Sequence, residues 1–495
     1  MGSRYAAGMV HSALIWSAWV GVMALMVVLA GGCTTPPYRT SGDALADLAN
    51  RDLNFRVRAR AAPSVLPMAV ASQRDVAVRA LESVAWDVTE HATLRSAAIR
   101  ALAADGGATR ERVRATAASV LPRERSREVV LNLCTLAADE GWTDLVPAIV
   151  QSYSRPVKGV TDEERAERAA LVRLCGDPAR CAFDAFVSSA TGPRASEPGE
   201  VRLRRDAWSV LARLDADGQR RRAWVAGLAP AGSGDVEVIQ RMLREWRTMP
   251  LTSEQLDWAA SLANKPQAWA DGAAALASLG AGEPVEMRHA SAAVWSGMHA
   301  PDLLSLSREQ VLERLTRRLE GRPVYLRTNE ASDKRVRERL SQVQDRLTKA
   351  DLIQIIALDE AVRNPAVVRA MFGHAELDQK DETTEYGGLI EVGPQGPRAV
   401  LYIPRMGERA GDSTFVASGE MIAAGDQALG HYHFHVQSWR QVNYAGPSEA
   451  DLAYATRYGR ACLVLTGIRE GVLAVDYYHP GEVVVDLGTI EMPGR

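Results

Sequence analysis

The chain has 495 residues, of which 47% are apolar and 24% are charged, and its formal net charge is −3. This composition is typical of a globular protein with room for about three domains, and it excludes a disordered or collagen-like chain. The near-neutral charge, without a run of Lys and Arg, also excludes the basic face of a nucleic-acid-binding protein, so we expect no nucleic acid as a partner.

Residues 1–32 have the order of an export signal. Arg4 precedes an apolar run over residues 13–30, and two glycines then lead into Cys33. A charged start, an apolar segment and small residues form the usual order of a secretory signal peptide. The last five residues of this stretch, Leu-Ala-Gly-Gly-Cys, resemble a bacterial lipobox. The resemblance implies that the signal peptide is removed and that Cys33 carries a lipid.

The alternative for the same segment is an uncleaved membrane anchor, because 18 apolar residues approach the length that crosses a bilayer. Both interpretations attach the rest of the chain to the cell membrane and place it outside the cytoplasm. Residues 33–43 contain Pro36 and Pro37, which cannot start a helix together, so this stretch is predicted to be a tether.

Two later cysteines fit an exported protein. Cys175 and Cys181 flank a short loop that a disulfide can close in an oxidising compartment. Two separate buried thiols would give the same pattern, so the sequence leaves the disulfide open.

Residues 44–330 are predicted to form an α-helical repeat module. Up to about residue 141, an arginine follows an apolar residue at Arg58, Arg79, Arg95 and Arg114, and alternate members are 37 and 35 residues apart. The spacing and the many alanines resemble HEAT-like two-helix repeats, in which we expect the alanines between helices and the arginines at the surface. Such a module binds a protein partner or the substrate; the alternative is a structural spacer.

The sequence changes character after residue 330. Residues 331–374 are predicted to be a helical connector, with helices over about 335–347 and 349–372. Residues 375–495 are rich in strand-like runs and carry one clear helix, over about 449–458. The expected strands cover 386–392, 399–403, 414–417, 428–435, 461–466, 472–478 and 483–487. The predicted fold is therefore multidomain: an all-α, solenoid-like module followed by a C-terminal α/β domain.

Three of the nine histidines fall within five residues, at His431, His433 and His435. On a strand, alternation puts all three imidazoles on one face, where adjacent histidines reach the same ion. Asp451 follows, in a Ser-x-x-Asp segment that starts at Ser448. Two neutral imidazoles and one carboxylate give three ligands and leave the fourth position of a tetrahedral zinc ion open for water, which is the catalytic arrangement.

A further carboxylate, Glu385, stands 48 residues before His433 in a Glu-x-x-Gly-Leu segment and is a candidate proton acceptor. This segment, the His-x-His strand and the Ser-x-x-Asp turn together resemble the JAMM motif of the JAB/MPN metalloprotease family, over about residues 375–495. The roles that the resemblance implies are zinc ligand for His433, His435 and Asp451, general base for Glu385 and oxyanion stabilisation for Ser448.

The pattern leaves some alternatives open. The spacing equally permits a shifted pair of ligands, His431 with His433. Fifteen residues separate His435 from Asp451, so the loop over 437–447 has to bulge outward to keep these ligands together. Ser448 with Asp451 is also a capping box at the start of a helix. Outside this cluster, His479 is expected in a surface turn, and satisfied or exposed positions are expected for His91, His289, His299 and His374.

The leading prediction is a membrane-tethered, zinc-dependent hydrolase of peptide or isopeptide bonds, which acts on a peptide or protein substrate outside the cytoplasm, in the periplasm or beyond. The helical module would bind the substrate or a protein partner. The alternative from another class is a lipoprotein scaffold whose MPN-like domain only binds a partner. A third possibility is a domain that holds the metal without catalysis.

Overall fold

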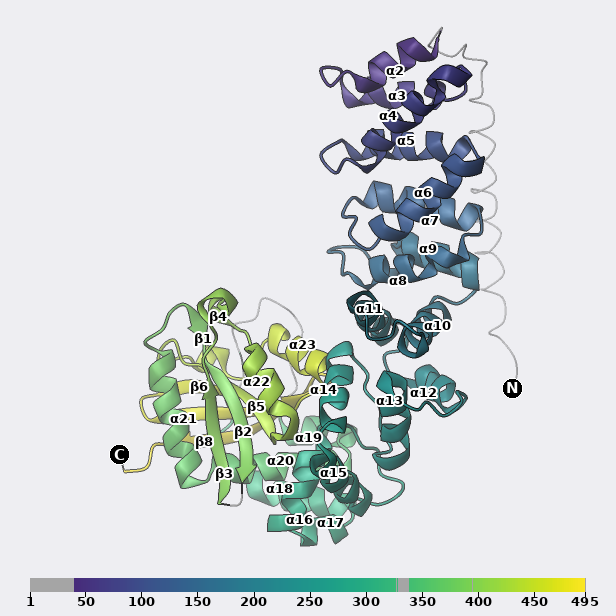
Figure 1. Cartoon of the computed structure of the whole chain (residues 1–495). Helices are drawn as coiled ribbons and strands as arrows, with labels where there is room; N and C mark the ends of the chain where they lie inside the picture. Colours follow the sequence, from purple (N-terminus) through teal and green to yellow (C-terminus); the bar gives the residue numbers. More distant parts are fainter. Residues whose placement is uncertain (1–39, 326, 328–337, 394, 495) are drawn as a thin grey trace, which may run out of the picture. The chain divides into compact units, whose positions relative to one another are not determined.

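The computed structural model describes residues 40–325, 327, 338–393 and 395–494 (Figure 1). The predicted signal peptide, Cys33 and most of the tether lie outside the described residues. Among the helices that are described, none combines the length and the apolar character needed to span a bilayer. The chain forms two compact units, which divide between Asp177 and Pro178.

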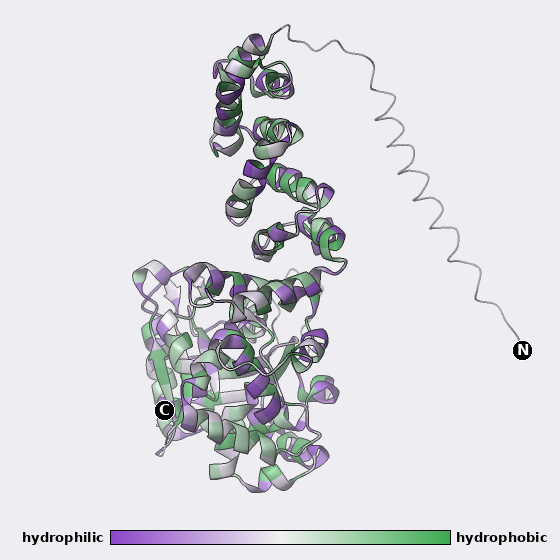
Figure 2. Cartoon of the chain, turned by 45° about the vertical axis from the view of Figure 1, so that its right-hand side comes forward, coloured by the Kyte–Doolittle hydropathy of each residue, from purple (hydrophilic) through white to green (hydrophobic). Residues whose placement is uncertain are grey.

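The N-terminal unit, up to Asp177, consists in its described part of helices and turns. Its helices are α2 (Ser41–Ala49), α3 (Phe55–Val65), α4 (Arg74–Trp86), α5 (Ala92–Ala104), α6 (Gly107–Val120), α7 (Arg127–Asp139), α8 (Val146–Ser154) and α9 (Ala166–Cys175), with 3₁₀ turns η1 (Ala71–Gln73), η2 (Thr143–Leu145) and η3 (Asp162–Glu164). Helices α3, α5, α7 and α9 form one row in which each contacts the next, and α6 contacts α8 in another. Figure 2 shows hydrophobic and hydrophilic residues on the same helices, as expected for helices stacked in rows.

Two of the repeated arginines lie inside this stack, and the expectation that they lie at the surface was wrong. Arg58 is 5% exposed and Arg95 is 3% exposed. Each guanidinium donates to a carbonyl in the last turn of an earlier helix, Leu48 of α2 and Ala85 of α4. The last carbonyls of a helix lack partners within that helix, so a buried arginine satisfies them and joins neighbouring repeats.

The C-terminal unit, residues 178–495, begins with a series of helices: α10 (Pro178–Thr191), α11 (Pro198–Leu214), α12 (Gln219–Ala226), α13 (Gly234–Glu245), α14 (Ser253–Ala263), α15 (Pro266–Ser278), α16 (His289–His299), α17 (Asp302–Ser305), α18 (Arg308–Leu319), α19 (Leu340–Val343), α20 (Lys349–Val362) and α21 (Pro365–Asp378). The helix expected over 335–347 is represented, in its described part, by α19 and the 3₁₀ turn η4 (Gln344–Arg346).

One hydrophobic core joins these helices to the strands that follow, with buried members from Val238 to Ile490. Helix α20 lies at its centre, and Glu360 is the one residue of α20 that is not buried. A helix with buried residues on all its faces needs neighbours on every side, and the buried polar residues of α20, such as Asp351 and Asp359, find partners there. The sheet therefore does not have a core of its own that begins at residue 375, since helices from α13 onward share it.

The strands are β1 (Thr384–Glu385), β2 (Gly387–Gly393), β3 (Gly396–Tyr402), β4 (Gly411–Phe415), β5 (Gly430–His435), β6 (Cys462–Arg469), β7 (Val472–His479) and β8 (Val483–Glu491). Strands β2 to β8 overlap the seven expected runs, and α23 (Glu449–Tyr458) covers the expected helix; β1, the helix α22 (Gly419–Ala424) and the 3₁₀ turns η5 (Met406–Glu408), η6 (Gly425–Gln427) and η7 (Val442–Tyr444) were not expected. The prediction of a helical module followed by a C-terminal α/β domain is thus confirmed.

Six strands form a mixed sheet in the order β3-β2-β5-β6-β7-β8, and β1 pairs with β4 beside it. Strand β5 lies inside the sheet, antiparallel to β2 and parallel to β6. Tyr432 and Phe434 belong to the large core below one face of the sheet, whereas α23 packs with Cys462 and Val464 on the other. The alternation along β5 therefore turns its histidines toward α23.

The cysteines are of two kinds. Cys175 and Cys181 are disulfide-bonded, whereas Cys134 and Cys462 carry buried free thiols. The structure thus favours the disulfide over the alternative of two separate thiols.

Candidate metal centre

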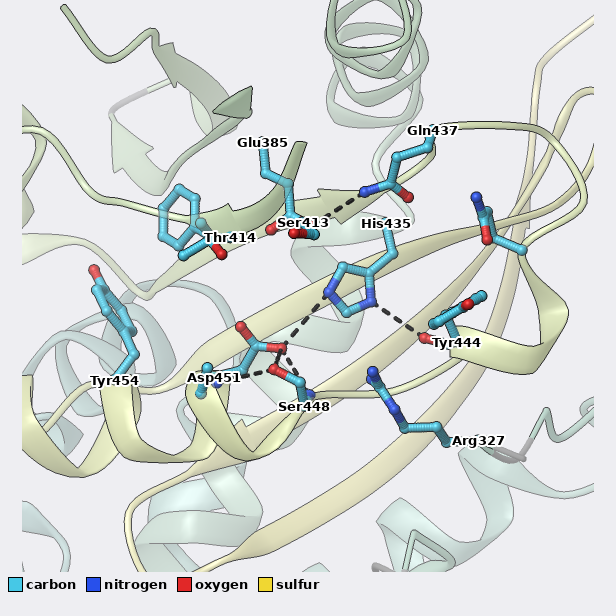
Figure 3. Close-up of a pocket in the computed structure, with 13 residues that line it drawn as sticks. Arg327, Glu385, Ser413, Thr414, His435, Gln437, Tyr444, Ser448, Asp451 and Tyr454 are labelled. Atoms are coloured by element: carbon cyan, nitrogen blue, oxygen red, sulfur yellow. Dashed lines mark hydrogen bonds and ion pairs between the residues drawn. The ribbon is translucent and has the colours of Figure 1, made fainter. Parts of the chain in front are cut away.

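The structure brings together the five residues that the sequence nominated. Glu385 ends β1, His433 and His435 lie on β5, and Ser448 and Asp451 begin α23. Four of them line one cavity, as Figure 3 shows, and the buried His433 contacts His435 and Asp451. Strand pairing explains why Glu385 lies near the histidines. Glu385 ends β1, directly before β2, and β2 pairs with β5, which bears His433 and His435.

Three ligand atoms face one another at the bottom of this cavity. Nε2 of His433 lies 3.3 Å from Nε2 of His435 and 3.2 Å from Oδ1 of Asp451, and Nε2 of His435 lies 3.6 Å from Oδ2 of Asp451. A tetrahedral zinc ion about 2.0–2.1 Å from each ligand separates those ligands by about 3.3–3.4 Å. These separations are close to those in a tetrahedral zinc site, with each histidine facing a different oxygen of Asp451.

Glu385 belongs to the same cluster. Ligand atoms of Glu385, His433 and His435 all lie within 4.8 Å of one another, and this buried group has the composition of a metal site. The Asp451 carboxylate does more than Glu385 to raise the pKa of His433, which favours Asp451 as the third ligand. Oε1 of Glu385 accepts a hydrogen bond of 3.1 Å from Nε2 of Gln437.

The remaining ring nitrogens orient both histidines. Nδ1 of His435 lies 3.1 Å from the carbonyl oxygen of Tyr444, and because a carbonyl only accepts, this nitrogen carries the proton. The lone pair of His435 is then on Nε2, which faces the cluster. Nδ1 of His433 lies 3.4 Å from the hydroxyl of Tyr478, and its ring stacks on Phe415 with centroids 4.9 Å apart. Such outer contacts hold metal-binding imidazoles in position.

The charges of the cluster are strongly coupled. Burial and the neighbouring His433 lower the pKa of His435 to about 4, so this imidazole is neutral at pH 7. Burial disfavours the charged form of His433 too, but the Asp451 carboxylate outweighs it and raises the pKa of His433. Burial alone would raise the pKa of Asp451, yet His433 holds that pKa well below its usual range. A metal ion at this position would compete with a proton for His433, because the raised pKa favours the protonated form.

Ser448 and Asp451 do form the capping box that was the alternative explanation for them. The backbone N–H and the hydroxyl of Ser448 donate to Oδ2 of Asp451 at 2.7 and 2.8 Å, and the Asp451 N–H donates to the Ser448 hydroxyl at 3.3 Å. Oδ1 of Asp451 faces His433. The cap and the ligand role are therefore compatible, because the cap holds the carboxylate in the orientation that the centre needs.

The cavity above the centre has a volume of about 360 Å³. Its walls come from β1, β4, β5, the loop after β5, the start of α23 and Arg327; the lining residues are Arg327, Glu385, Ser413, Thr414, Phe415, His435, Gln437, Gln441, Tyr444, Ser448, Ala450, Asp451 and Tyr454. The loop over 437–447 does not cover the centre but forms one wall of the cavity.

The alternative ligand pair, His431 with His433, does not form in the structure, where His433 faces His435. Nδ1 of His431 lies 2.7 Å from the hydroxyl of Tyr454, while its Nε2 faces Gly425, where a Cβ atom would approach to 2.8 Å. Burial and the nearby Arg460 hold the pKa of His431 well below its usual range, so it is neutral. His433 pairs with His435, and His431 serves as a neighbour of Tyr454.

The isolated histidines have mixed outcomes. The surface position expected for His479 was wrong, because it is the last residue of β7, is 4% exposed and has Nε2 3.8 Å from Oδ1 of Asp351. His289, 2.9 Å from the same carboxylate oxygen, and His374, 2.8 Å from the hydroxyl of Tyr432, are satisfied as expected.

Three residues of the centre were missed by the sequence analysis: Phe415, Gln437 and Tyr444. They support His433, Glu385 and His435 through a ring stack, an amide and a backbone carbonyl. None of them belongs to the sequence motif that nominated the ligands. The sequence did place two of them, Gln437 and Tyr444, in the long loop between His435 and Asp451, and this position could have suggested a role near the site.

Comparison with protein-family models, with curated proteins and with solved structures found no match to this chain. Its function is therefore inferred from the residues and the geometry of this centre.

Proposed function

We propose that the protein is a zinc-dependent hydrolase of peptide or isopeptide bonds, with a C-terminal domain of the JAB/MPN type. The observation that carries this proposal is the close approach of His433 Nε2, His435 Nε2 and the Asp451 carboxylate, at separations near those between the corners of a zinc-sized tetrahedron. The order of Glu385, the His-x-His strand and the Ser-x-x-Asp turn, which resembles the JAMM motif, supports the same conclusion.

The number of ligands favours a catalytic over a structural metal. Structural zinc sites are closed by four protein ligands, whereas catalytic sites use three and keep one position open. Here His435 and Asp451 line a cavity of about 360 Å³, so a metal held by these residues would be accessible to a substrate. When bound at such a site, zinc supplies a Lewis acid that polarises a carbonyl group and makes water a stronger acid.

The chain's own residues provide the proton transfer and the charge stabilisation. Glu385, oriented by Gln437, takes a proton from the attacking water at a carboxylate oxygen and gives it to the leaving amine. Ser448 lines the same cavity, and its hydroxyl, which donates to Oδ2 of Asp451 in this structure, would turn to the carbonyl oxygen to stabilise the negative charge that develops there. His433, His435 and Asp451 hold the metal, while the buried position of the cluster excludes bulk water.

The test is zinc stoichiometry by elemental analysis of the full chain, purified in mild detergent. We expect about one zinc per chain in the wild type and none in the double variant His433→Ala, His435→Ala. The exposed residue His299 offers a matched control, and His299→Ala should keep the metal. Absence of zinc from the wild type would refute the hydrolase and leave the non-catalytic scaffold as the better explanation.

We further propose that the chain is exported and tethered by lipid on Cys33, with the N-terminal helices as a site for a protein partner or the substrate. The disulfide-bonded state of Cys175 and Cys181 supports export, because disulfides persist in oxidising compartments. Mass spectrometry of the mature N-terminus tests this proposal. A diacylglyceryl mass on Cys33, lost in Cys33→Ala, is expected; an intact leader would instead support the uncleaved anchor.

A further inference from the structure

Beside the metal centre, the cavity holds a second chemical feature that the hydrolase mechanism does not use. Arg327 lines the cavity together with Glu385, His435, Ser448 and Asp451. In Figure 3, Glu385 and Arg327 lie at opposite ends of the group, with His435, Asp451 and Ser448 between them. Glu385 and Asp451 belong to the metal centre. Among the lining residues that the structure describes, Arg327 is the one Lys or Arg.

The loop over 437–447, between β5 and α23, also contacts Arg327. Nη1 of Arg327 donates to the carbonyl of Gly446 at 3.0 Å, and its guanidinium carbon lies 5.9 Å from the ring centroid of Tyr444. The carbonyl of Tyr444 in turn accepts from His435. The guanidinium and a candidate metal ligand therefore both contact the three-residue segment over 444–446.

The chemistry of this end of the cavity is that of a carboxylate site. A guanidinium carries five N–H donors in a planar fork that matches the two oxygens of a carboxylate, and it binds several acceptors at once. The neighbouring Ser448, Gln441 and Tyr444 add neutral polar groups along the wall. The guanidinium therefore favours an anionic group at this end of the cavity.

The size of the cavity limits where on the substrate this carboxylate lies. Ligand pockets range over roughly 300–1,000 Å³, and a volume of about 360 Å³ accommodates a short peptide segment but not a folded domain. A group that reaches Arg327 while the scissile carbonyl lies at the metal centre therefore belongs to a residue at or next to the scissile bond.

We propose that Arg327 binds a carboxylate of the substrate close to the bond that is cut, so the enzyme acts on peptides with a terminal carboxylate or an acidic side chain at that point. The inference rests on the proposed zinc hydrolase and adds a substrate class to it. Arg327 acts as a binding residue and takes no part in the proton transfer.

Matched zinc-binding probes test the proposal without a known substrate. They are mercaptoacetyl-Ala-Ala with a free C-terminal carboxylate, the same compound as a C-terminal amide, and mercaptoacetyl-Ala-Glu-amide, in all of which the thiol binds the metal. Affinities are measured by calorimetry on the zinc-loaded full chain in mild detergent. We expect the best carboxylate probe to bind about 10- to 100-fold more tightly than the neutral amide, as for a charged hydrogen-bonded pair.

Variants at position 327 then test whether Arg327 causes the preference for carboxylate probes. Arg327→Gln should abolish the preference and leave the affinity for the neutral amide unchanged, while Arg327→Lys should keep part of the preference. Arg440→Gln is the matched control. Arg440 is an exposed arginine of the loop over 437–447 that does not line the cavity, so this variant should keep the full preference. Zinc content and melting temperature show whether each variant remains folded.

The outcomes separate this inference from the proposed function. Tighter binding of the free acid identifies a terminal carboxylate, and tighter binding of the Glu probe alone identifies an acidic side chain. Equal affinities for all three probes, or a preference that survives Arg327→Gln, overturn the carboxylate site while the zinc centre stands. A wild-type chain that binds no zinc overturns both.

Discussion

The Arg95–Glu124 pair of the N-terminal unit and the candidate metal centre of the C-terminal unit both bury charged side chains, but they do so in opposite ways. In the N-terminal unit, Nη1 and Nη2 of Arg95 meet the two oxygens of Glu124 at 3.3 and 2.5 Å, and Nε donates to the carbonyl of Ala85. In the metal centre, His433, His435 and Asp451 point groups with lone pairs at one another. The first arrangement pairs each donor with an acceptor, whereas the second gathers acceptors around a single point.

This contrast shows that burial of charge alone does not identify a functional site. Arg95 and Glu124 are each less than a tenth exposed, as are His433 and Asp451. A buried pair with complementary geometry joins two repeats and needs no further ligand. A buried group of acceptors becomes stable only with a cation or a proton between its members, which is why the second cluster indicates a metal.

The largest expected effect is on catalytic activity, which should depend on the candidate metal centre and not on the buried ion pairs of the N-terminal unit. Glu385→Gln should lower the rate of peptide hydrolysis by about 10²- to 10⁴-fold, the usual contribution of a general base, and leave the zinc content unchanged. Cleavage of a mixed peptide library, followed by mass spectrometry, measures this rate. Glu90→Gln, which changes the carboxylate paired with Arg58 in the N-terminal unit, should not alter the rate per folded molecule. Equal rates in Glu385→Gln and the wild type would exclude Glu385 as the base.

The next effect acts on stability in the N-terminal unit. Arg95→Ala leaves the buried Glu124 without its partner and should lower the free energy of unfolding by about 3–5 kcal/mol. Arg112→Ala removes an exposed ion pair with Glu82 and should cost at most about 1 kcal/mol. Urea unfolding followed by circular dichroism measures both. Similar losses for the two variants would mean that Arg95 does not join the repeats.

Zinc should stabilise one unit and not the other. A free zinc concentration of about 100 times the dissociation constant stabilises the folded state by about 2.7 kcal/mol. Hydrogen exchange with and without zinc should show this protection in β5 and α23 but not in α5 or α7. Loss of the difference in His433→Ala, His435→Ala would attribute it to the centre, while protection of the N-terminal helices would contradict the assignment.

The smallest effect is a pH dependence of the N-terminal unit. Burial would raise the pKa of Glu124, but hydrogen bonds from Arg95 and from the backbone of Ser126 hold it below its usual value. A carboxyl whose pKa is lower in the folded state stabilises that state above the unfolded pKa of about 4.3, and this contribution is lost as the pH falls through the folded pKa. Urea midpoints between pH 6 and pH 3 should therefore fall less steeply in Glu124→Gln than in the wild type.

Predictions from the sequence succeeded where a property depends on neighbours in the chain. The start of α23 follows from Ser448 and Asp451, three residues apart, and the shared face of His433 and His435 follows from strand alternation. They failed where a distant segment decides. Arg95 is buried because Glu124 and the end of α4 meet it, and His479 is buried because α20 brings Asp351 beside β7.

The sequence by itself determined the order of helical and strand-rich regions and nominated the candidate ligand residues, because periodicity, capping and residue chemistry are local. Only the tertiary structure decided which two histidines face each other, and how closely Asp451 and Glu385 approach them. It also placed Arg327 in the wall of the same cavity. These features require β1, β5 and α23 to be brought together from positions far apart in the chain, and this is done by strand pairing and the shared hydrophobic core.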